Sequence, residues 1–196
     1  MNSLMVSNDR EYRTFEMRIA EGDMHVEGYA AVFDSPTTLY SYDGVDYKEE
    51  IDTKAFDNAE MQDVVMNYNH AGKPVARTKN GTLELSTDMT GLHIRADLSG
   101  TEEGRRLYEE IKGGYIDKMS FAFTVSEDSY DRDTHTRRVL GIKRLYDVAA
   151  VDMPAYDATS ISARSYFSAE VEKVKQAEAR AQQKIRKTKL LLEVLK

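Results

Sequence analysis

Apolar and polar residues alternate along most of this chain, so that the dominant period is two. Phe15, Met17 and Ile19, for example, alternate with charged residues. Because successive side chains of a β-strand point to opposite faces, this alternation predicts strands with one buried face. The same β pattern is found in residues 29–33, 83–85, 92–98, 118–125, 137–143 and 145–151.

One segment between these strands has the period of a helix instead. Leu107, Tyr108 and Ile111 fall on one helical face, Thr101 is suited to cap the N-terminus, and two glycines follow at positions 113 and 114. Glycine is common just beyond the end of a helix, so we expect a helix between Thr101 and the glycine pair. A shorter helical turn is expected within residues 52–59.

The chain changes character from Ala169 onward. This segment contains no Gly or Pro and is rich in Ala, Glu, Lys, Gln and Arg, which favours a long helix. A tail without stable structure is the alternative. Apolar residues near a heptad line would form a stripe that the helix cannot bury by itself, namely Val171, Val174, Ala181, Ile185, Leu192 and Leu195.

Together these elements predict a mainly β fold with one or two helices, in the α+β class. The 196 residues are enough for one full domain and an appendage. We divide the chain into a flexible lead-in at residues 1–10, a domain at residues 11–168 and a helical tail at residues 169–196.

The composition argues against several classes of protein. A chain without cysteine has no disulfides, thiolate metal sites or cysteine nucleophile, which fits a reducing cytoplasm. No run approaches the roughly 18 apolar residues of a membrane-spanning helix. The N-terminus also lacks the pattern of a secretory signal. We therefore expect no membrane partner.

The charge is spread unevenly. The net charge is −7, but residues 169–196 contain eight Lys/Arg and four Asp/Glu and so carry +4, which leaves −11 for the rest. An acidic body argues against a nucleic-acid partner. The basic tail instead suggests an arm that docks on an acidic protein surface.

His70 is the histidine with the best setting for chemistry. It follows the apolar run that contains Val64, Val65 and Met66, and Gly72 and Pro74 are expected to define the turn after it. An imidazole held at the edge of a core can act as a general base. The other reading is a polar residue at a strand end. The remaining histidines, His25, His93 and His135, have the settings of surface residues, and none of the four has metal-ligand spacing, so no cofactor is expected.

Two further stretches could complete a catalytic group. Ser120 lies in the apolar strand KMSFAF, where alternation places it on the face opposite Phe121. A serine hydroxyl becomes a nucleophile only beside a base, and otherwise Ser120 is an ordinary strand residue. Asp147 lies in the apolar strand LYDVAAVD, where burial of its carboxylate requires a partner such as a histidine nitrogen. Asp152, on the opposite face of its strand, is an alternative to Asp147 as the acid. Lys118 shares a face with Ser120 and could instead act as its base in a Ser–Lys pair.

The ordered set of NHAGKPVAR, KMSFAF and LYDVAAVDMPAY resembles the tailed-phage prohead protease family of capsid maturation. The earlier stretches VEGYAAVFDSP and EEIDTKAFDNA match the usual start of that family, so that the resemblance covers about residues 12 to 165. It departs from the family at Asp147-Val148-Ala149, where Glu-Val-Ser is more usual, and at Ala76-Arg77, where Gly-Arg is common.

This resemblance implies a serine endopeptidase with a β-barrel flanked by helices, similar in fold to the herpesvirus assembly proteases. His70 would be the base, Ser120 the nucleophile and Asp147 the orienting acid. The expected substrate is a scaffold protein, or the scaffold segment of the major capsid protein, inside the procapsid in the host cytoplasm. Self-cleavage and self-association are further expectations. The alternative is a non-catalytic assembly factor of the same fold that binds scaffold through its tail.

Overall fold

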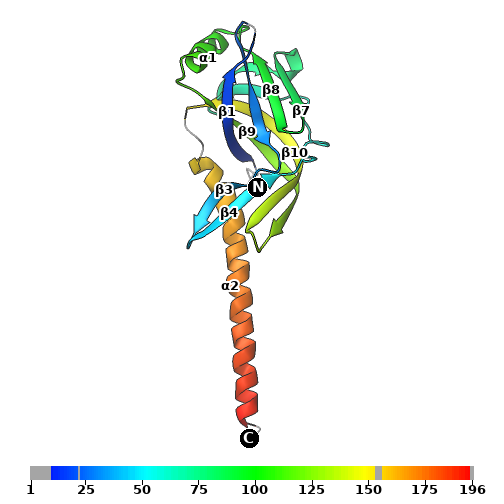
Figure 1. The fold of residues 1–196 in the computed structure, drawn as a ribbon, viewed down its shortest axis with the longest axis vertical. Helices are drawn as coiled ribbons and strands as arrows, with labels where there is room; N and C mark the ends of the chain where they lie inside the picture. The colour runs from blue at the N-terminus through cyan, green and yellow to red at the C-terminus, as the bar shows by residue number, and fades with distance from the viewer. Residues whose placement is uncertain (1–9, 22, 153–155, 195–196) are drawn as a thin grey trace, which may run out of the picture.

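The computed structural model describes residues 10–21, 23–152 and 156–194 (Figure 1). Its elements, in chain order, are β1 (Glu11–Ile19), β2 (His25–Val32), β3 (Thr37–Tyr42), β4 (Val45–Ile51), β5 (Val65–Tyr68), β6 (Ala71–Arg77), the short 3₁₀-helix η1 (Thr78–Asn80), β7 (Leu83–Thr87), β8 (Gly91–Asp97), α1 (Glu102–Lys112), β9 (Lys118–Asp131), β10 (Thr136–Val151) and α2 (Tyr156–Val194). The fold is therefore mainly β with a few helices, as predicted.

The long strand β10 organises the sheet. One of its edges pairs antiparallel with β9 along nearly its whole length. Its other edge is shared between two parallel partners, β4 at the start and β5 at the end. The C-terminal half of β10 consequently has β5 on one side and β9 on the other, and this three-strand region carries the residues of chemical interest.

The sheet is open in the part of the chain that the structure describes. The strand order is β3-β4-β10-β9-β1-β2-β8-β7, with the β5–β6 hairpin branching from β10, and β3 and β7 at the ends do not pair. The pairings thus give a ten-stranded sheet rather than the closed barrel that we expected. The similarity to herpesvirus assembly proteases stays a prediction.

The start of β9 lies at the centre of the core. Met119, Phe121 and Phe123 are fully buried, and the rings of Phe121 and Phe123 stack with centroids 4.7 Å apart. α1 buries the predicted apolar face, and its N-cap is the predicted one, because Thr101 Oγ1 accepts a hydrogen bond of 2.9 Å from the Gly104 amide. Packing and capping therefore agree in placing this helix.

Three local expectations were incomplete. The hairpin of β3 and β4 was not predicted, although Asp43 and Gly44 form its turn with positive φ angles of 51° and 78° and Asp-Gly is a strong hairpin signal. Residues 52–59 form turns and no helix. The predicted strands at 137–143 and 145–151 form the single strand β10, whose register shifts between Val139 and Asp147 keep it paired throughout.

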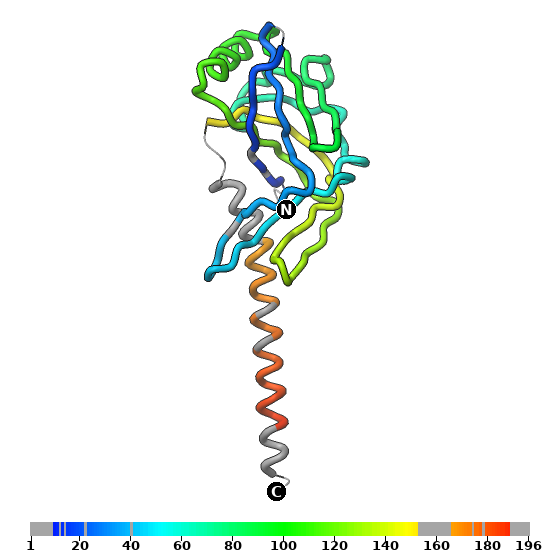
Figure 2. The backbone as a smooth tube through the Cα atoms, in the orientation of Figure 1, coloured from blue at the N-terminus to red at the C-terminus, as the bar shows by residue number. Residues whose placement is uncertain are grey.

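The predicted C-terminal helix is part of α2, which begins at Tyr156 rather than near Ala169. Figures 1 and 2 show α2 leaving the body and extending well beyond it. Its buried anchor is Phe167, whose ring lies 5.3 Å from that of Tyr47 and 6.1 Å from that of Tyr130. Among the described side chains, those in residues 175–188 are all exposed. No helix in the described residues has the length and apolar character needed to cross a membrane.

Candidate active site

His70 lies inside a hairpin turn. β5 and β6 pair with Tyr68 opposite Ala71, so that Asn69 and His70 are the two turn residues. Both have positive φ, 49° and 57°, as a type I′ turn requires. The expectation that Gly72 and Pro74 would define the turn was wrong, because both lie within β6. The chain therefore holds His70 in a left-handed conformation that few residues other than glycine adopt.

The imidazole of His70 contacts the carboxylate of Asp147. His70 Nδ1 lies 2.5 Å from Asp147 Oδ1, and the two side chains are only 15% and 9% exposed. An ionised carboxylate can only accept, so Nδ1 carries the proton and Nε2 is the nitrogen that can take one up. The imidazole thus supplies the partner that a carboxylate buried in an apolar strand requires.

Ser120 lies on the same face of the sheet as Asp147. On β10, Ala149 pairs with Ser120 of β9 on one side and with Asn67 of β5 on the other. Asp147 precedes Ala149 by two positions, and residues two apart on a strand share a face. Neighbouring strands are about 4.8 Å apart, so the side chains of Ser120, Asp147 and Asn67 are near neighbours on one surface.

This face contains polar atoms that the protein buries without satisfying them. Ser120 Oγ, Asn67 Oδ1 and Thr124 Oγ1 are buried and have no hydrogen-bond partner among the described residues. Each such atom costs about 1–3 kcal/mol relative to a satisfied one. Ser120 and Ala122, on the face opposite Phe121, are also fully buried. Buried polar atoms without a partner are uncommon in proteins, and a catalytic role is one of the reasons for them.

The two rival assignments have other partners. Asp152 Oδ2 accepts a hydrogen bond of 3.0 Å from the Tyr68 hydroxyl. This bond is the main reason why the pKa of Tyr68 is raised, because loss of its proton would place two anions together. Lys118 Nζ lies 3.1 Å from Glu16 Oε1 in an ion pair. Asp152 and Lys118 thus engage groups other than His70 and Ser120 in these contacts.

The other histidines contact different parts of the molecule. His25 Nδ1 lies 2.7 Å from the carbonyl oxygen of Asp23, the ring of His93 meets that of Tyr29 edge-on, and His135 Nδ1 lies 3.2 Å from the Tyr130 hydroxyl. Within the described residues, no group of three or more His, Asp or Glu side chains is arranged to hold a metal ion.

Sequence reasoning missed three residues around His70, namely Asn67, Tyr68 and Asn69. Asn67 is only 7% exposed and shares the face of Ser120. Tyr68 and Asn69 connect the turn to Asp152. The run Asn-Tyr-Asn-His places all of them in one short stretch. The pairing of β5 with β10 places Asn67 beside Ser120 and brings Tyr68 and Asn69 to Asp152, so the sequence pattern alone carried little signal.

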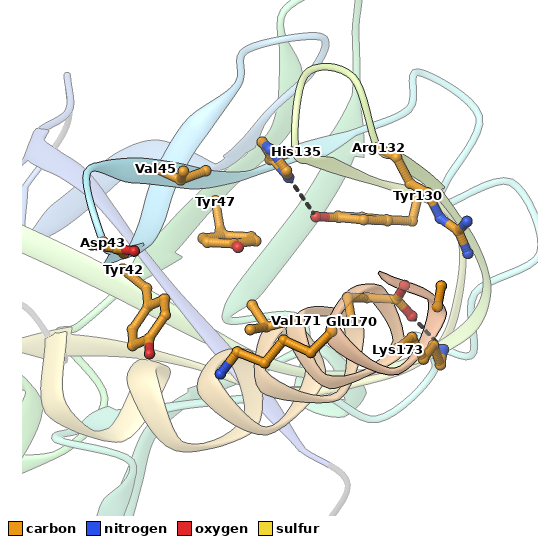
Figure 3. Close-up of a pocket in the computed structure, with 12 residues that line it drawn as sticks. Tyr42, Asp43, Val45, Tyr47, Tyr130, Arg132, His135, Glu170, Val171 and Lys173 are labelled. Carbon is orange, nitrogen blue, oxygen red and sulfur yellow. Dashed lines mark hydrogen bonds and ion pairs between the residues drawn. The ribbon is translucent and has the colours of Figure 1, made fainter. Parts of the chain in front are cut away.

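A separate cavity lies where α2 meets two hairpins (Figure 3). Its volume is about 620 Å³, and its walls come from the β3–β4 hairpin, the β9–β10 hairpin and α2. Tyr42, Tyr47 and Tyr130 supply aromatic surface, and Glu170 lies beside Lys173 at its edge. None of the residues that line it is His70, Ser120 or Asp147.

One comparison with known proteins agrees with the sequence motifs. The family model described as caudovirus prohead serine protease matches residues 11–177 of this chain. Among solved structures, the bacteriophage T4 capsid assembly protease gp21 is similar at 14% sequence identity and a TM-score of 0.47, covering 75% of this chain and 100% of that one. None of the curated proteins matches.

Proposed function

Because this chain belongs to the family of caudovirus prohead serine proteases, we propose that it is a serine endopeptidase of capsid maturation. In this proposal Ser120 is the nucleophile, His70 the general base and Asp147 the acid that orients His70. The family match spans residues 11–177 and so includes all three residues.

The observation that carries the proposal is the contact of 2.5 Å between His70 Nδ1 and Asp147 Oδ1. The two residues are far apart in the sequence and come from a hairpin turn and a central strand. A histidine with Nδ1–H bonded to a carboxylate has the tautomer that a general base needs. Ser120, on the same face, is the hydroxyl group that such a base would activate.

The chemistry follows from these roles. His70 Nε2 takes the proton of Ser120 Oγ as Oγ attacks the scissile carbonyl carbon, and the imidazolium that forms is stabilised by Asp147. The imidazolium then protonates the leaving amine, and an acyl-enzyme remains on Ser120. Water, activated by the same imidazole, hydrolyses the acyl-enzyme and restores the serine. The burial of the face strengthens each of these electrostatic interactions, because water does not screen them.

The proposed substrate is a scaffold protein or the scaffold segment of the major capsid protein. Cleavage would take place inside the procapsid, in the host cell, and the protease would also cut its own chain. The description of the family as prohead proteases supports this setting. Self-association of the protease inside the procapsid belongs to the same proposal.

The decisive experiment removes the proposed nucleophile. We expect Ser120→Ala, co-expressed with the major capsid protein and scaffold, to leave both uncut on a denaturing gel, because the proposed acyl-enzyme forms on the Ser120 hydroxyl. Ser129→Ala is the matched control, since Ser129 is an exposed serine of the same strand β9. This control should process its substrates normally.

Two results would count against the proposal. Normal processing by Ser120→Ala would exclude Ser120 as the nucleophile. An absence of shortened products from the unmodified protease, with procapsids still assembled, would favour the non-catalytic assembly factor instead.

A further inference from the structure

The turn that carries His70 needs support from outside itself. Asn69 and His70 both have left-handed backbone conformations, with φ of 49° and 57°. A left-handed conformation costs most residues other than glycine about 1–2 kcal/mol. A turn with this cost keeps its geometry only where neighbouring contacts hold it.

Contacts from the end of β10 supply that support. The Asn69 amide donates a hydrogen bond of 2.9 Å to the Ala150 carbonyl, which continues the β5–β10 ladder into the turn. The Asp152 amide lies 3.4 Å from Asn69 Oδ1, and the Tyr68 hydroxyl donates to Asp152 Oδ2 at 3.0 Å. Tyr68, Asn69 and Asp152 thus connect the turn to the chain just beyond β10, and we call these three residues the hairpin latch.

The latch and the catalytic contact act from opposite faces of β10. Tyr68 pairs with Ala150, which is three positions after Asp147 on β10, so the side chains of Tyr68 and Asp147 leave the sheet on opposite faces. Asp147 contacts the imidazole of His70 on one face, and Asp152 contacts Tyr68, at the base of the same turn, on the other. The His70 side chain is therefore held by Asp147, and the backbone of the turn is held by the hydrogen bond from the Asn69 amide to the Ala150 carbonyl.

We propose that the hairpin latch of Tyr68, Asn69 and Asp152 positions His70 for proton transfer from Ser120. In this proposal the latch residues act through the geometry of the turn and are positioning residues. This inference rests on the proposed serine protease function. It gives Asp152, the acid that competed with Asp147 in the sequence, a positioning role in the same site.

The latch is exposed, which makes it suitable for mutagenesis. Tyr68 is 41% exposed and Asp152 is also exposed, so removal of their hydrogen bond should leave the core intact. Tyr68→Phe deletes only the hydroxyl, and Asp152→Ala deletes the acceptor. Tyr29→Phe is the matched control, because the Tyr29 hydroxyl donates to Asp88 Oδ2 at 2.7 Å in an exposed bond that lies outside the site.

The first measurement is the rate at which a fluorophosphonate probe labels Ser120, which needs His70 but no knowledge of the cleavage sequence. We expect Tyr68→Phe and Asp152→Ala each to slow labelling about tenfold, since small displacements of a catalytic group have large effects on rate. The double variant should be no slower than the single ones, because both remove the same contact. Tyr29→Phe should label as the unmodified protein does.

The second measurement reads His70 without any reaction. The downfield proton resonance of His70 Nδ1–H reports its bond to Asp147, and we expect it to broaden or disappear in Tyr68→Phe but not in Tyr29→Phe. Unchanged labelling together with an unchanged resonance in Tyr68→Phe would overturn the latch. If the unmodified protein is not labelled at Ser120, the protease proposal fails, and the resonance then decides the latch alone.

Discussion

At the scale of single residues, the shorter acid is the feature that distinguishes this site. The sequence resemblance predicts Glu at the position of Asp147, and an Asp side chain is one methylene shorter than a Glu side chain. The left-handed turn of Asn69 and His70 brings the imidazole back toward β10, and Nδ1 comes within 2.5 Å of Oδ1. The turn therefore places the imidazole within hydrogen-bond distance of the Asp147 carboxylate.

This contact leads to a prediction for Asp147→Asn. An asparagine amide can donate to Nδ1 and so favour the tautomer with the proton on Nε2, which cannot act as a base. We expect the rate of peptide cleavage to fall about a thousandfold or more, while the thermal unfolding temperature changes little. The control Asp46→Asn alters an exposed carboxylate that accepts from Ser41 and should leave the rate unchanged. A fall of less than tenfold in Asp147→Asn would argue against an orienting role for Asp147.

At the scale of elements, a buried network of charges joins strands β1, β4 and β10. Arg13 of β1 contacts Glu49 of β4 at 2.5 Å, and Arg137 of β10 contacts Glu11 of β1 at 2.7 Å and Glu49 at 3.1 Å. All four side chains are nearly inaccessible to solvent. Each charge is compensated within the network, so loss of one partner leaves another charge buried and unpaired.

The network predicts a dependence of stability on pH. Burial by itself raises the pKa of Glu11, but Arg13 and Arg137 outweigh burial and lower the pKa below its usual value of 4.5. A carboxylate with a lowered folded-state pKa stabilises the protein above pH 4.5, and this contribution is lost as the pH falls through the folded-state value. We expect Glu11→Gln to lower the free energy of unfolding at pH 7 by about 3 kcal/mol.

Urea denaturation at a series of pH values would measure this effect. The difference between Glu11→Gln and the unmodified protein should shrink as the pH falls below 4.5. Glu16→Gln, which removes an exposed carboxylate of the same strand, should cost less than about 1 kcal/mol at any pH. If the difference in unfolding free energy between Glu11→Gln and the unmodified protein stayed constant with pH, it would contradict the assignment of Glu11 as an ionised carboxylate with a lowered pKa.

At the scale of the whole molecule, α2 joins a packed segment to an exposed one. Near its start, Phe167 is buried against the β3–β4 and β9–β10 hairpins, and Glu170 is also buried. From Lys175 to Thr188 the described side chains are exposed, including Ile185 at 57%. An exposed helix of net positive charge is suited to a partner outside the domain, and the sequence predicts an acidic protein surface.

Truncation after Ala177 tests this division. Because the removed residues whose side chains are described are exposed, we expect the unfolding free energy and the rate of Ser120 labelling to stay the same. Incorporation of the protease into procapsids, measured on purified particles by immunoblotting, should fall. Phe167→Ala is the contrasting variant and should destabilise the protein by about 3–5 kcal/mol, because it leaves a cavity between α2 and the hairpins. Equal incorporation of the truncated protein would exclude the docking role.

Much of the secondary structure was predictable because it depends on local patterns. The alternation around Phe15 and around Ile94 identified β1 and β8, and Thr101 marked the start of α1. The β3–β4 hairpin could also have been found from Asp43-Gly44. The full length of β10 could not have been predicted from the sequence, because its register shifts depend on the neighbouring strands rather than on its own alternation.

The sequence by itself identified His70, Ser120 and Asp147 as candidates, since each is a reactive residue type in or beside an apolar strand, and their order matched a known family. Only the tertiary structure decided which of them contact each other or share a face. β10 pairs with β5 on one side and β9 on the other, which places Asp147, Ser120 and Asn67 on one face. The tertiary structure also pairs Asp152 with Tyr68 and Asp147 with His70. These residues are far apart in the sequence, and the strand pairing that brings them together is not encoded in any local pattern.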